Sequence, residues 1–205
     1  MIGILDYGLG NIRAFYNIYH SLNIPCTVIK KTSELININK IILPGVGSFD
    51  FAMQKFNDSG FKNIIEKMVL IDKMPVLGIC VGMQMLAKSS DEGNIKGLGW
   101  IDADVKNLNN LNKDNNLILP HMGWNKINFK SNNPLFNNFK KDSSNFYFLH
   151  SYYFKCNNNT DSIAQTNYGQ IFSSAVNADN IYGVQFHPEK SHNNGMDLLY
   201  NFSKL

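Results

Sequence analysis

Short apolar runs alternate with amphipathic stretches through the first half of the chain, and this alternation limits the folds open to it. The runs that we interpret as buried strands are 2–6, 27–29, 40–43 and 76–79, the third stopped by Pro44-Gly45. Between them, apolar residues recur at helical spacing at Ile12, Phe15, Tyr19 and Leu22, and again at Phe61, Ile64, Ile65 and Met68. This alternation predicts an α/β fold, in which a central and mostly parallel sheet is flanked by helices.

The second half of the chain has shorter apolar runs, separated by asparagine-rich turns. The runs that we interpret as strands are 117–119, 146–149, 162–166, 171–176 and 181–186. We expect this strand-rich half to extend the same sheet, partly in antiparallel pairing, before a closing helix around Met196, Leu198, Leu199 and Phe202. The segments 106–116, 131–145 and 155–161 are rich in Asn, Lys and Ser, which predicts surface loops.

Length and charge narrow the class of protein. A chain of 205 residues suits one well-packed domain, so we expect a single domain over residues 1–205. The net charge of +3 and the lack of a Lys/Arg cluster argue against a nucleic-acid partner. We expect no signal peptide, no membrane helix and a cytoplasmic location, because the chain starts with an apolar strand and three scattered cysteines suit a reducing compartment.

A cysteine stands between two glycines at the end of one predicted strand. The segment Gly78-Ile79-Cys80-Val81-Gly82 follows the run 76–79 and precedes a helix-like stretch at 83–87. Strand, sharp turn and helix in this order form a nucleophile elbow, here with sulfur in place of the serine oxygen. The flanking glycines let the backbone adopt strained dihedral angles and leave room for a substrate beside the sulfur. Cys80 is therefore a candidate nucleophile.

A base and an orienting carboxylate follow the last predicted strand, in Gln185-Phe186-His187-Pro188-Glu189. A thiol needs a base to become a good nucleophile at neutral pH, and the base needs a group that orients it. Residues just beyond the carboxyl ends of parallel strands converge on one crevice, so Cys80 and His187 can meet although they are distant in the chain. The sequence therefore predicts an enzyme with a Cys-His-Glu triad.

A thiolate that attacks a carbonyl also needs donors for the oxyanion that forms. The backbone N–H of Val81, directly after the nucleophile, is one candidate. The glycines of Pro44-Gly45-Val46-Gly47 can turn a second N–H toward the site, but the same segment also fits a plain strand-to-helix turn.

Other chemistries fit the sequence less well. Gly8-Leu9-Gly10 is similar to a dinucleotide-binding loop, but Arg13 stands where the third glycine belongs. The segment from His187 to His192 contains Pro188, which argues against the helical histidine pair of a zinc protease. We therefore predict no metal and no cofactor. By default, His121 and His150 are structural or interface residues, and Cys26 and Cys156 are small apolar fillers.

Six motifs occur in the same order as in one protein family. They are Tyr7-Gly8-Leu9-Gly10-Asn11, Pro44-Gly45-Val46-Gly47, Gly78-Ile79-Cys80-Val81-Gly82-Met83-Gln84, His121-Met122-Gly123-Trp124-Asn125, His150-Ser151-Tyr152-Tyr153 and Gln185-Phe186-His187-Pro188-Glu189-Lys190-Ser191. With these motifs the chain resembles the class I (triad) glutamine amidotransferases from Ile2 to Phe202. The segments around Trp124 and Tyr152, and the ending Lys190-Ser191, narrow the resemblance to glutaminase subunits of imidazole glycerol phosphate synthase, in histidine biosynthesis.

The resemblance implies a reaction. Cys80 would attack the side-chain amide of glutamine, His187 would carry the thiol proton to the leaving nitrogen, and Glu189 would hold the imidazole. Water would then release glutamate, and ammonia would pass to a cyclase/synthase subunit in a heterodimer. The resemblance also implies substrate-binding residues Gln84, Glu92, His150, Ser151 and Tyr152, oxyanion residues Gly45, Val46 and Val81, and interface residues Asn11, Trp124 and Lys190.

Three alternatives share much of this pattern. A paralogous subunit that supplies ammonia for the amidation of a surface sugar would keep the same active-site residues. A stand-alone thiol hydrolase would turn over without a partner. A non-enzymatic binding module would be favoured by the loss of Cys80, His187 or Glu189, but all three are present.

Overall fold

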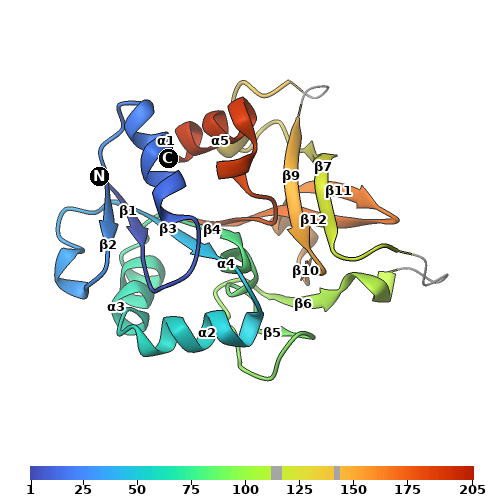
Figure 1. The fold of residues 1–205 in the computed structure, drawn as a ribbon, viewed down its shortest axis with the longest axis horizontal. Coiled ribbons are helices and arrows are strands. Elements are labelled where there is room, and N and C mark those ends of the chain that lie inside the picture. The colour runs from blue at the N-terminus through green and yellow to red at the C-terminus, as the bar shows by residue number, and fades with distance from the viewer. Residues whose placement is uncertain (112–116, 141–143) are drawn as a thin grey trace.

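The computed structural model describes residues 1–111, 117–140 and 144–205 of the chain (Figure 1). Its strands are β1 (Ile2–Leu5), β2 (Cys26–Ile29), β3 (Lys40–Gly45), β4 (Val76–Cys80), β5 (Ser89–Ser90), β6 (Ala103–Asn107), β7 (His121–Lys126), β8 (Asn128–Phe129), β9 (Asn145–His150), β10 (Tyr152–Cys156), β11 (Ser162–Tyr168), β12 (Gln170–Ala178) and β13 (Ile181–Val184). Its α-helices are α1 (Ile12–Ser21), α2 (Phe49–Asp58), α3 (Lys62–Glu66), α4 (Val81–Gln84) and α5 (His192–Lys204).

In the described residues, one sheet of eleven strands forms the centre of the molecule, in the order β2-β1-β3-β4-β13-β12-β10-β6-β5, with β11 paired to β12 and β8. A second sheet pairs β7 with β9. Helices α1 and α5 cover one face of the large sheet, and α2 and α3 lie on the other (Figure 1). The predicted α/β architecture, with helices on both faces, is confirmed.

The sheet changes from parallel to antiparallel pairing at β13. From β2 to β13, all neighbouring strands run parallel, whereas β12 runs antiparallel to β13 and to β10. Strands β1 and β4 are buried along their whole length, as their uninterrupted apolar sequences require between two helical layers. The predicted antiparallel extension in the second half is therefore confirmed.

Strand β3 does not stop at Pro44, as the sequence predicts, but continues to Gly45. Its pairing with β1 ends at Ile42, whereas its pairing with β4 runs on to the Gly45–Cys80 pair. The Pro44 carbonyl faces the β1 side, where it accepts a hydrogen bond from the Tyr7 hydroxyl at 2.5 Å. A proline is tolerated there because its missing N–H would also face this unpaired side.

Four predictions for the second half need correction. Residues 117–119 lie in no strand. The segment predicted as a loop over 131–145 contains a short 3-10 turn, Pro134–Phe136, that buries Leu135 and Phe136, and β9 begins at its end. The other two predicted loops contain the ends of β6 and β10. These elements are formed by isolated apolar residues among asparagines. The asparagine-rich composition of the segments did not indicate them. Residues 112–116 and 141–143 of these predicted loops lie outside the described residues.

The turn from β4 into α4 packs against β3 at very short range. Cys80 has a positive φ of 55° with ψ of −112°, a sparsely populated conformation that costs an L-residue on the order of 1–3 kcal/mol. A Cβ added at Gly82 would lie 2.0 Å from the Leu43 carbonyl oxygen, and one added at Gly78 would lie 2.6 Å from the Gly82 oxygen. The strained dihedral angles thus belong to Cys80 itself, and the two glycines contribute close backbone approach.

We expect Gly82→Ala to destabilise the fold by about 3 kcal/mol, because its Cβ would displace β3 backbone from the elbow. The control is Gly60→Ala, at a glycine with φ of +77° and open space around it, where only the conformational cost of about 1 kcal/mol applies. Urea denaturation midpoints measure both. Equal losses of stability would contradict a steric role for Gly82.

Candidate active site

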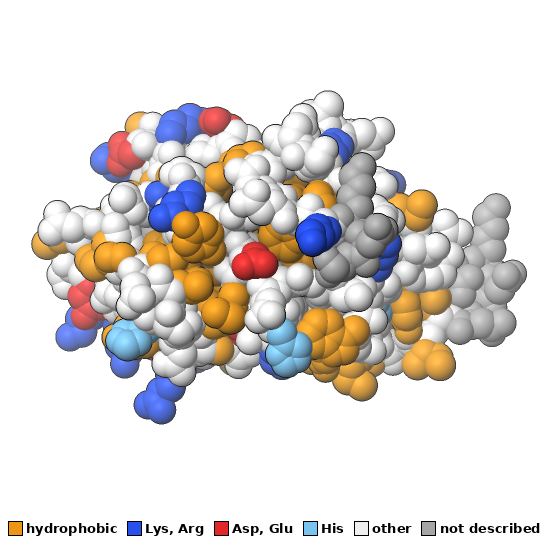
Figure 2. Space-filling view, turned by 90° about the horizontal axis from the view of Figure 1, so that it is seen from above, with side chains coloured by type: hydrophobic (Ala, Val, Ile, Leu, Met, Phe, Trp, Pro, Cys, Tyr) orange, Lys and Arg blue, Asp and Glu red, His pale blue; other side chains and the backbone are white. Residues whose placement is uncertain are grey.

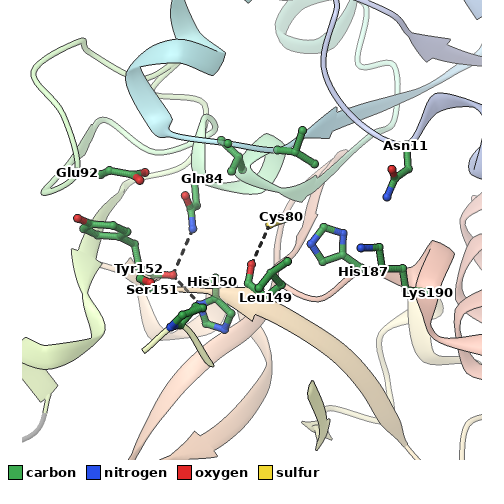
Figure 3. Close-up of a pocket in the computed structure, with 14 residues that line it drawn as sticks. Asn11, Cys80, Gln84, Glu92, Leu149, His150, Ser151, Tyr152, His187 and Lys190 are labelled. Atoms are coloured by element: carbon green, nitrogen blue, oxygen red, sulfur yellow. Dashed lines mark hydrogen bonds between the residues drawn. The ribbon is translucent and has the colours of Figure 1, made fainter. Parts of the chain in front are cut away.

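The carboxyl end of β4 and the turn after β13 open onto one cavity of about 350 Å³, small in the range of small-molecule sites (Figure 3). Cys80 and His187 both line it. They meet because β4 and β13 are neighbouring parallel strands, in register at Ile79 and Val184. The predicted convergence of thiol and imidazole is therefore confirmed.

His187 and Glu189 form a hydrogen-bonded pair beside Cys80. The His187 Nδ1 lies 2.9 Å from the Glu189 Oε1, and the His187 side chain lines the same cavity as Cys80. The His187 and Glu189 side chains are buried, at 4% and 2% exposure. The carboxylate thus orients the base in the same cavity that holds the nucleophile, an arrangement that suits thiol activation.

The backbone of His187 is fixed to β9. Its N–H donates to the Tyr147 carbonyl at 2.8 Å, and its carbonyl accepts from the Ser191 hydroxyl at 2.6 Å. The Ser191 oxygen in turn accepts from the Tyr147 N–H at 3.0 Å. Asn11 completes the arrangement by donating to Glu189 Oε1 at 2.9 Å. These contacts hold the base and its carboxylate in one orientation.

The triad favours a charged imidazole. Burial by itself would lower the pKa of His187, but the interactions of His187 with Cys80 and Glu189 outweigh burial and raise that pKa to about 10. The pKa of Glu189 is lowered, since the bonds from His187 and Asn11 outweigh the opposing effect of burial. An imidazolium next to a carboxylate is the form that stabilises a thiolate nucleophile.

The other end of the cavity is lined by an amide and a carboxylate. Gln84 Nε2 donates to the Tyr152 carbonyl and to Gln185 Oε1, both at 3.2 Å. Glu92 accepts from the Phe49 N–H at 2.9 Å, and burial raises the pKa of its carboxyl group. In Figure 3, Gln84 and Glu92 lie to one side of Cys80, and His187, Lys190 and Asn11 lie to the other.

The remaining candidate residues from the sequence are placed as follows. Val46, Val81, His150, Ser151, Tyr152, Asn11 and Lys190 line the cavity. Gly45 is paired with Cys80 in the β3–β4 ladder, and the wall beyond it consists of Val46 and Gly47. Lys190 places its ammonium group 5.6 Å from the centre of the Tyr147 ring. Trp124 lies away from this cavity, half exposed, and stacks on His192.

Two contacts of the thiol were missed by sequence reasoning. The Cys80 thiol donates to the Leu149 carbonyl at 3.8 Å, and Gln185 Nε2 donates to the sulfur at 3.9 Å. Gln185 is a fully buried amide at the end of an apolar run, which is a signal that the sequence offered. The sequence offered no such signal for the Leu149 carbonyl, because every residue has a backbone carbonyl.

The cysteines, metal-ligating side chains, helices and basic side chains outside the cavity limit which other kinds of site the described residues can form. Burial raises the pKa of the Cys26 and Cys156 thiols, that of Cys156 to about 11, so both favour the unreactive protonated form. In the described residues, no group of three or more His, Cys, Asp or Glu side chains is arranged to hold a metal ion. None of the described helices is long and apolar enough to cross a membrane. Lys and Arg side chains are scattered over the face shown in Figure 2 and form no stripe among its coloured residues.

Comparison with known families defines the class of this protein. Residues 3–205 match the family described as glutamine amidotransferase class-I. The chain therefore belongs to the class-I glutamine amidotransferase family.

Two curated relatives are similar over their entire length. The chain is 54% identical to the imidazole glycerol phosphate synthase subunit HisH of Bdellovibrio bacteriovorus, over 205 residues and 100% of both chains. It is 50% identical to the subunit of the same name from Leptospira borgpetersenii, again over 100% of both.

Solved structures agree on the fold. A crystal structure described as a glutamine amidotransferase matches with a TM-score of 0.73 at 16% identity, covering 100% of this chain and 99% of that one. A chain in the structure of PurLQS from Thermotoga maritima matches with a TM-score of 0.72 at 15% identity, covering 99% of this chain and 96% of that one. At these identities the match shows the fold alone.

We expect Glu189→Gln to lower the pKa of His187, because the amide cannot stabilise an imidazolium as the carboxylate does. The folded-state pKa of His187 lies above its unfolded value of about 6.5. Its contribution to stability is thus complete below that value and is lost as the pH rises toward about 10. In Glu189→Gln, the unfolding midpoint should depend less on pH over this window.

Nuclear magnetic resonance titration of ¹⁵N-labelled histidine measures the pKa, and urea denaturation at several pH values measures the stability. Glu66→Gln, which makes the same chemical change on α3, is the matched control. An unchanged titration of His187 in Glu189→Gln would contradict the ion pair.

Proposed function

We propose that this chain is the glutaminase subunit of an imidazole glycerol phosphate synthase, which hydrolyses glutamine to glutamate and ammonia and passes the ammonia to a cyclase/synthase subunit. One observation carries the proposal: Cys80 and His187 line a small cavity, with Glu189 buried against His187, in a chain 54% identical along its whole length to a relative of that name. The fold and family membership agree with it.

The proposed reaction has two halves. The Cys80 sulfur attacks the side-chain amide carbon of glutamine, the C–N bond breaks, and His187 delivers the thiol proton to the leaving nitrogen, which departs as ammonia. Water, deprotonated by His187, then attacks the glutamyl thioester, and glutamate and the free thiol are released. The contact of Glu189 with His187 supports its role in stabilising the imidazolium that forms in both halves.

The oxyanion needs donors near the sulfur, and the end of β3 is well situated to supply one beside the N–H of Val81. Val46 and Gly47 form the wall next to Cys80, and Gly47 has a φ of +86°. Glycine tolerates both signs of φ, so the peptide before it can rotate. One missing oxyanion donor costs on the order of 100- to 1,000-fold in rate, so such a rotation suffices as a switch.

The polar groups at the far end of the cavity suit the amino-acid head of glutamine. Glu92 supplies a carboxylate for the ammonium group, and the wall formed by Ser151 and Tyr152 offers backbone groups. Gln84 is fixed between Tyr152 and Gln185, which supports a role in positioning this wall.

The face beside the cavity suits a docked partner. Met122 and Leu149 are cross-strand neighbours on β7 and β9, exposed by 65% and 37%, and Leu149 also lines the cavity. Trp124 continues this apolar surface along β7. A subunit that covers it, with Asn11 and Lys190 at the cavity, would keep ammonia away from bulk water, where it would become protonated and non-nucleophilic.

We expect Cys80→Ala to reduce glutamine hydrolysis by on the order of 10⁴-fold or more, because no other group at the cavity can form the thioester. Binding of the partner subunit should be unchanged. Cys26→Ala removes a half-buried thiol on β2 and is the matched control. Glutaminase activity that persists in Cys80→Ala would contradict the mechanism.

We expect this chain to co-purify with an imidazole glycerol phosphate cyclase. Its glutaminase activity should rise at least about tenfold when the cyclase carries its own substrate, because the switch would add an oxyanion donor. Hydrolysis is assayed as glutamate release with and without that substrate. Full activity of the chain alone would favour a stand-alone hydrolase. Stimulation by a sugar-amidating enzyme in place of the cyclase would favour the paralogous subunit.

A further inference from the structure

A chain of hydrogen bonds runs to the wall of the cavity through two histidines that the triad does not use. Asn125 Nδ2 lies 3.2 Å from His121 Nε2, and His121 Nδ1 lies 2.9 Å from His150 Nε2. His150 Nδ1 then lies 2.8 Å from the Tyr152 carbonyl oxygen. Both imidazoles are buried, at 3% and 6% exposure. The chain thus links β7 to the wall of the cavity.

The direction of each bond follows from the orientation of the Asn125 amide. Its Nδ2 donates to the Asn167 carbonyl at 3.0 Å, and its Oδ1 accepts from the Lys126 N–H at 2.8 Å. Nδ2 is therefore the atom facing His121, so His121 Nε2 must accept. His121 then carries its proton on Nδ1 and donates it to His150 Nε2, which leaves the proton of His150 on Nδ1, facing the Tyr152 carbonyl.

A neutral state of both rings is consistent with their surroundings. Burial lowers the pKa of His121 to about 4, and burial together with the nearby His121 lowers the pKa of His150 to about 3. A second proton on His121 would point at the Asn125 amide donor. Phe148 and Tyr168 stack on the His121 ring, with centroids 4.7 and 4.1 Å away. They hold the ring in the orientation that its hydrogen bonds to Asn125 and His150 require.

We propose that His121 is a positioning residue for glutamine binding, acting through His150 on the Ser151–Tyr152 wall of the cavity. The Tyr152 carbonyl accepts from His150 and from Gln84, so two donors fix the plane of the Tyr152–Tyr153 peptide at the end of this wall. Without the proton of His121, the buried His150 Nε2 has no hydrogen-bond donor. His150 is then no longer required to carry its own proton on Nδ1, where it donates to Tyr152. The inference rests on the proposed function only for the identity of the ligand.

The first test is the tautomer of each ring. In the full-length protein labelled with ¹⁵N-histidine, two-bond nitrogen–hydrogen spectra at neutral pH should show His121 and His150 both as Nδ1–H tautomers. Free imidazole side chains in water prefer the Nε2–H form, so this result is diagnostic. Spectra of His121→Asn and His150→Asn assign the signals. An Nε2–H tautomer or a charged ring at either position would overturn the inference.

The second test separates substrate binding from chemistry in the complex with the synthase subunit. His121→Leu removes the donor and should raise the KM for glutamine about tenfold, with kcat within about twofold of wild type. His121→Asn keeps a donor near the Nδ1 position and should recover most of the affinity. Phe172→Leu removes ring packing against both histidines without removing a hydrogen bond, and should lower the denaturation midpoint but leave KM unchanged.

The outcomes distinguish this inference from the proposed function. A wild-type complex that does not hydrolyse glutamine would refute the function, whatever the variants do. An active wild type with an unchanged KM in His121→Leu would overturn the positioning role alone, as would an equal rise in KM for Phe172→Leu. If His121→Leu fails to fold, the tautomer measurement still decides the inference.

Discussion

The packing of the Cys80 turn against β3 is the contact on which the whole site depends. The strained backbone of Cys80 aims the sulfur into the cavity, and it persists because surrounding structure fixes the residues on both sides. Behind it, the Gly82 backbone lies against the Leu43 carbonyl at a distance that no side chain would permit. The same contact brings the end of β3, with Val46 and Gly47, alongside the sulfur. The packing of the Cys80 turn against β3 therefore fixes both the position of the nucleophile and the geometry of the candidate oxyanion donors.

Three histidines around this cavity divide into two electrostatic kinds. His187 contacts a thiol and a carboxylate, and these partners favour its charged form. His121 and His150 have as partners each other, an amide and a carbonyl, so burial keeps both neutral. A charged His150 would compete with His187 for the thiolate, since the two rings border the same cavity. Residue type alone does not decide these roles; the hydrogen-bond partner of each nitrogen does.

The sequence predicted the features that are local or periodic. Uninterrupted apolar runs indicated β1 and β4, helical spacing indicated α1 and α5, and the Gly-X-Cys-X-Gly pattern indicated the turn around Cys80. The meeting of Cys80 with His187 was also predictable, because it follows from a rule about strand ends. Features that depend on distant pairing were not: Pro44 within a central strand and the buried turn at Leu135 are defined by neighbours that no sequence window contains.

Because β4 and β13 are adjacent strands, this architecture tolerates changes in the length of the polypeptide between them. The nucleophile and the base follow β4 and β13, which are hydrogen-bonded to each other, so their separation is set by the spacing between two backbones. The intervening polypeptide, with its asparagine-rich segments, leaves that spacing alone when it lengthens or shortens. Homologues can therefore acquire large insertions between the two motifs and still preserve catalytic alignment, and a designer can graft new segments there for the same reason.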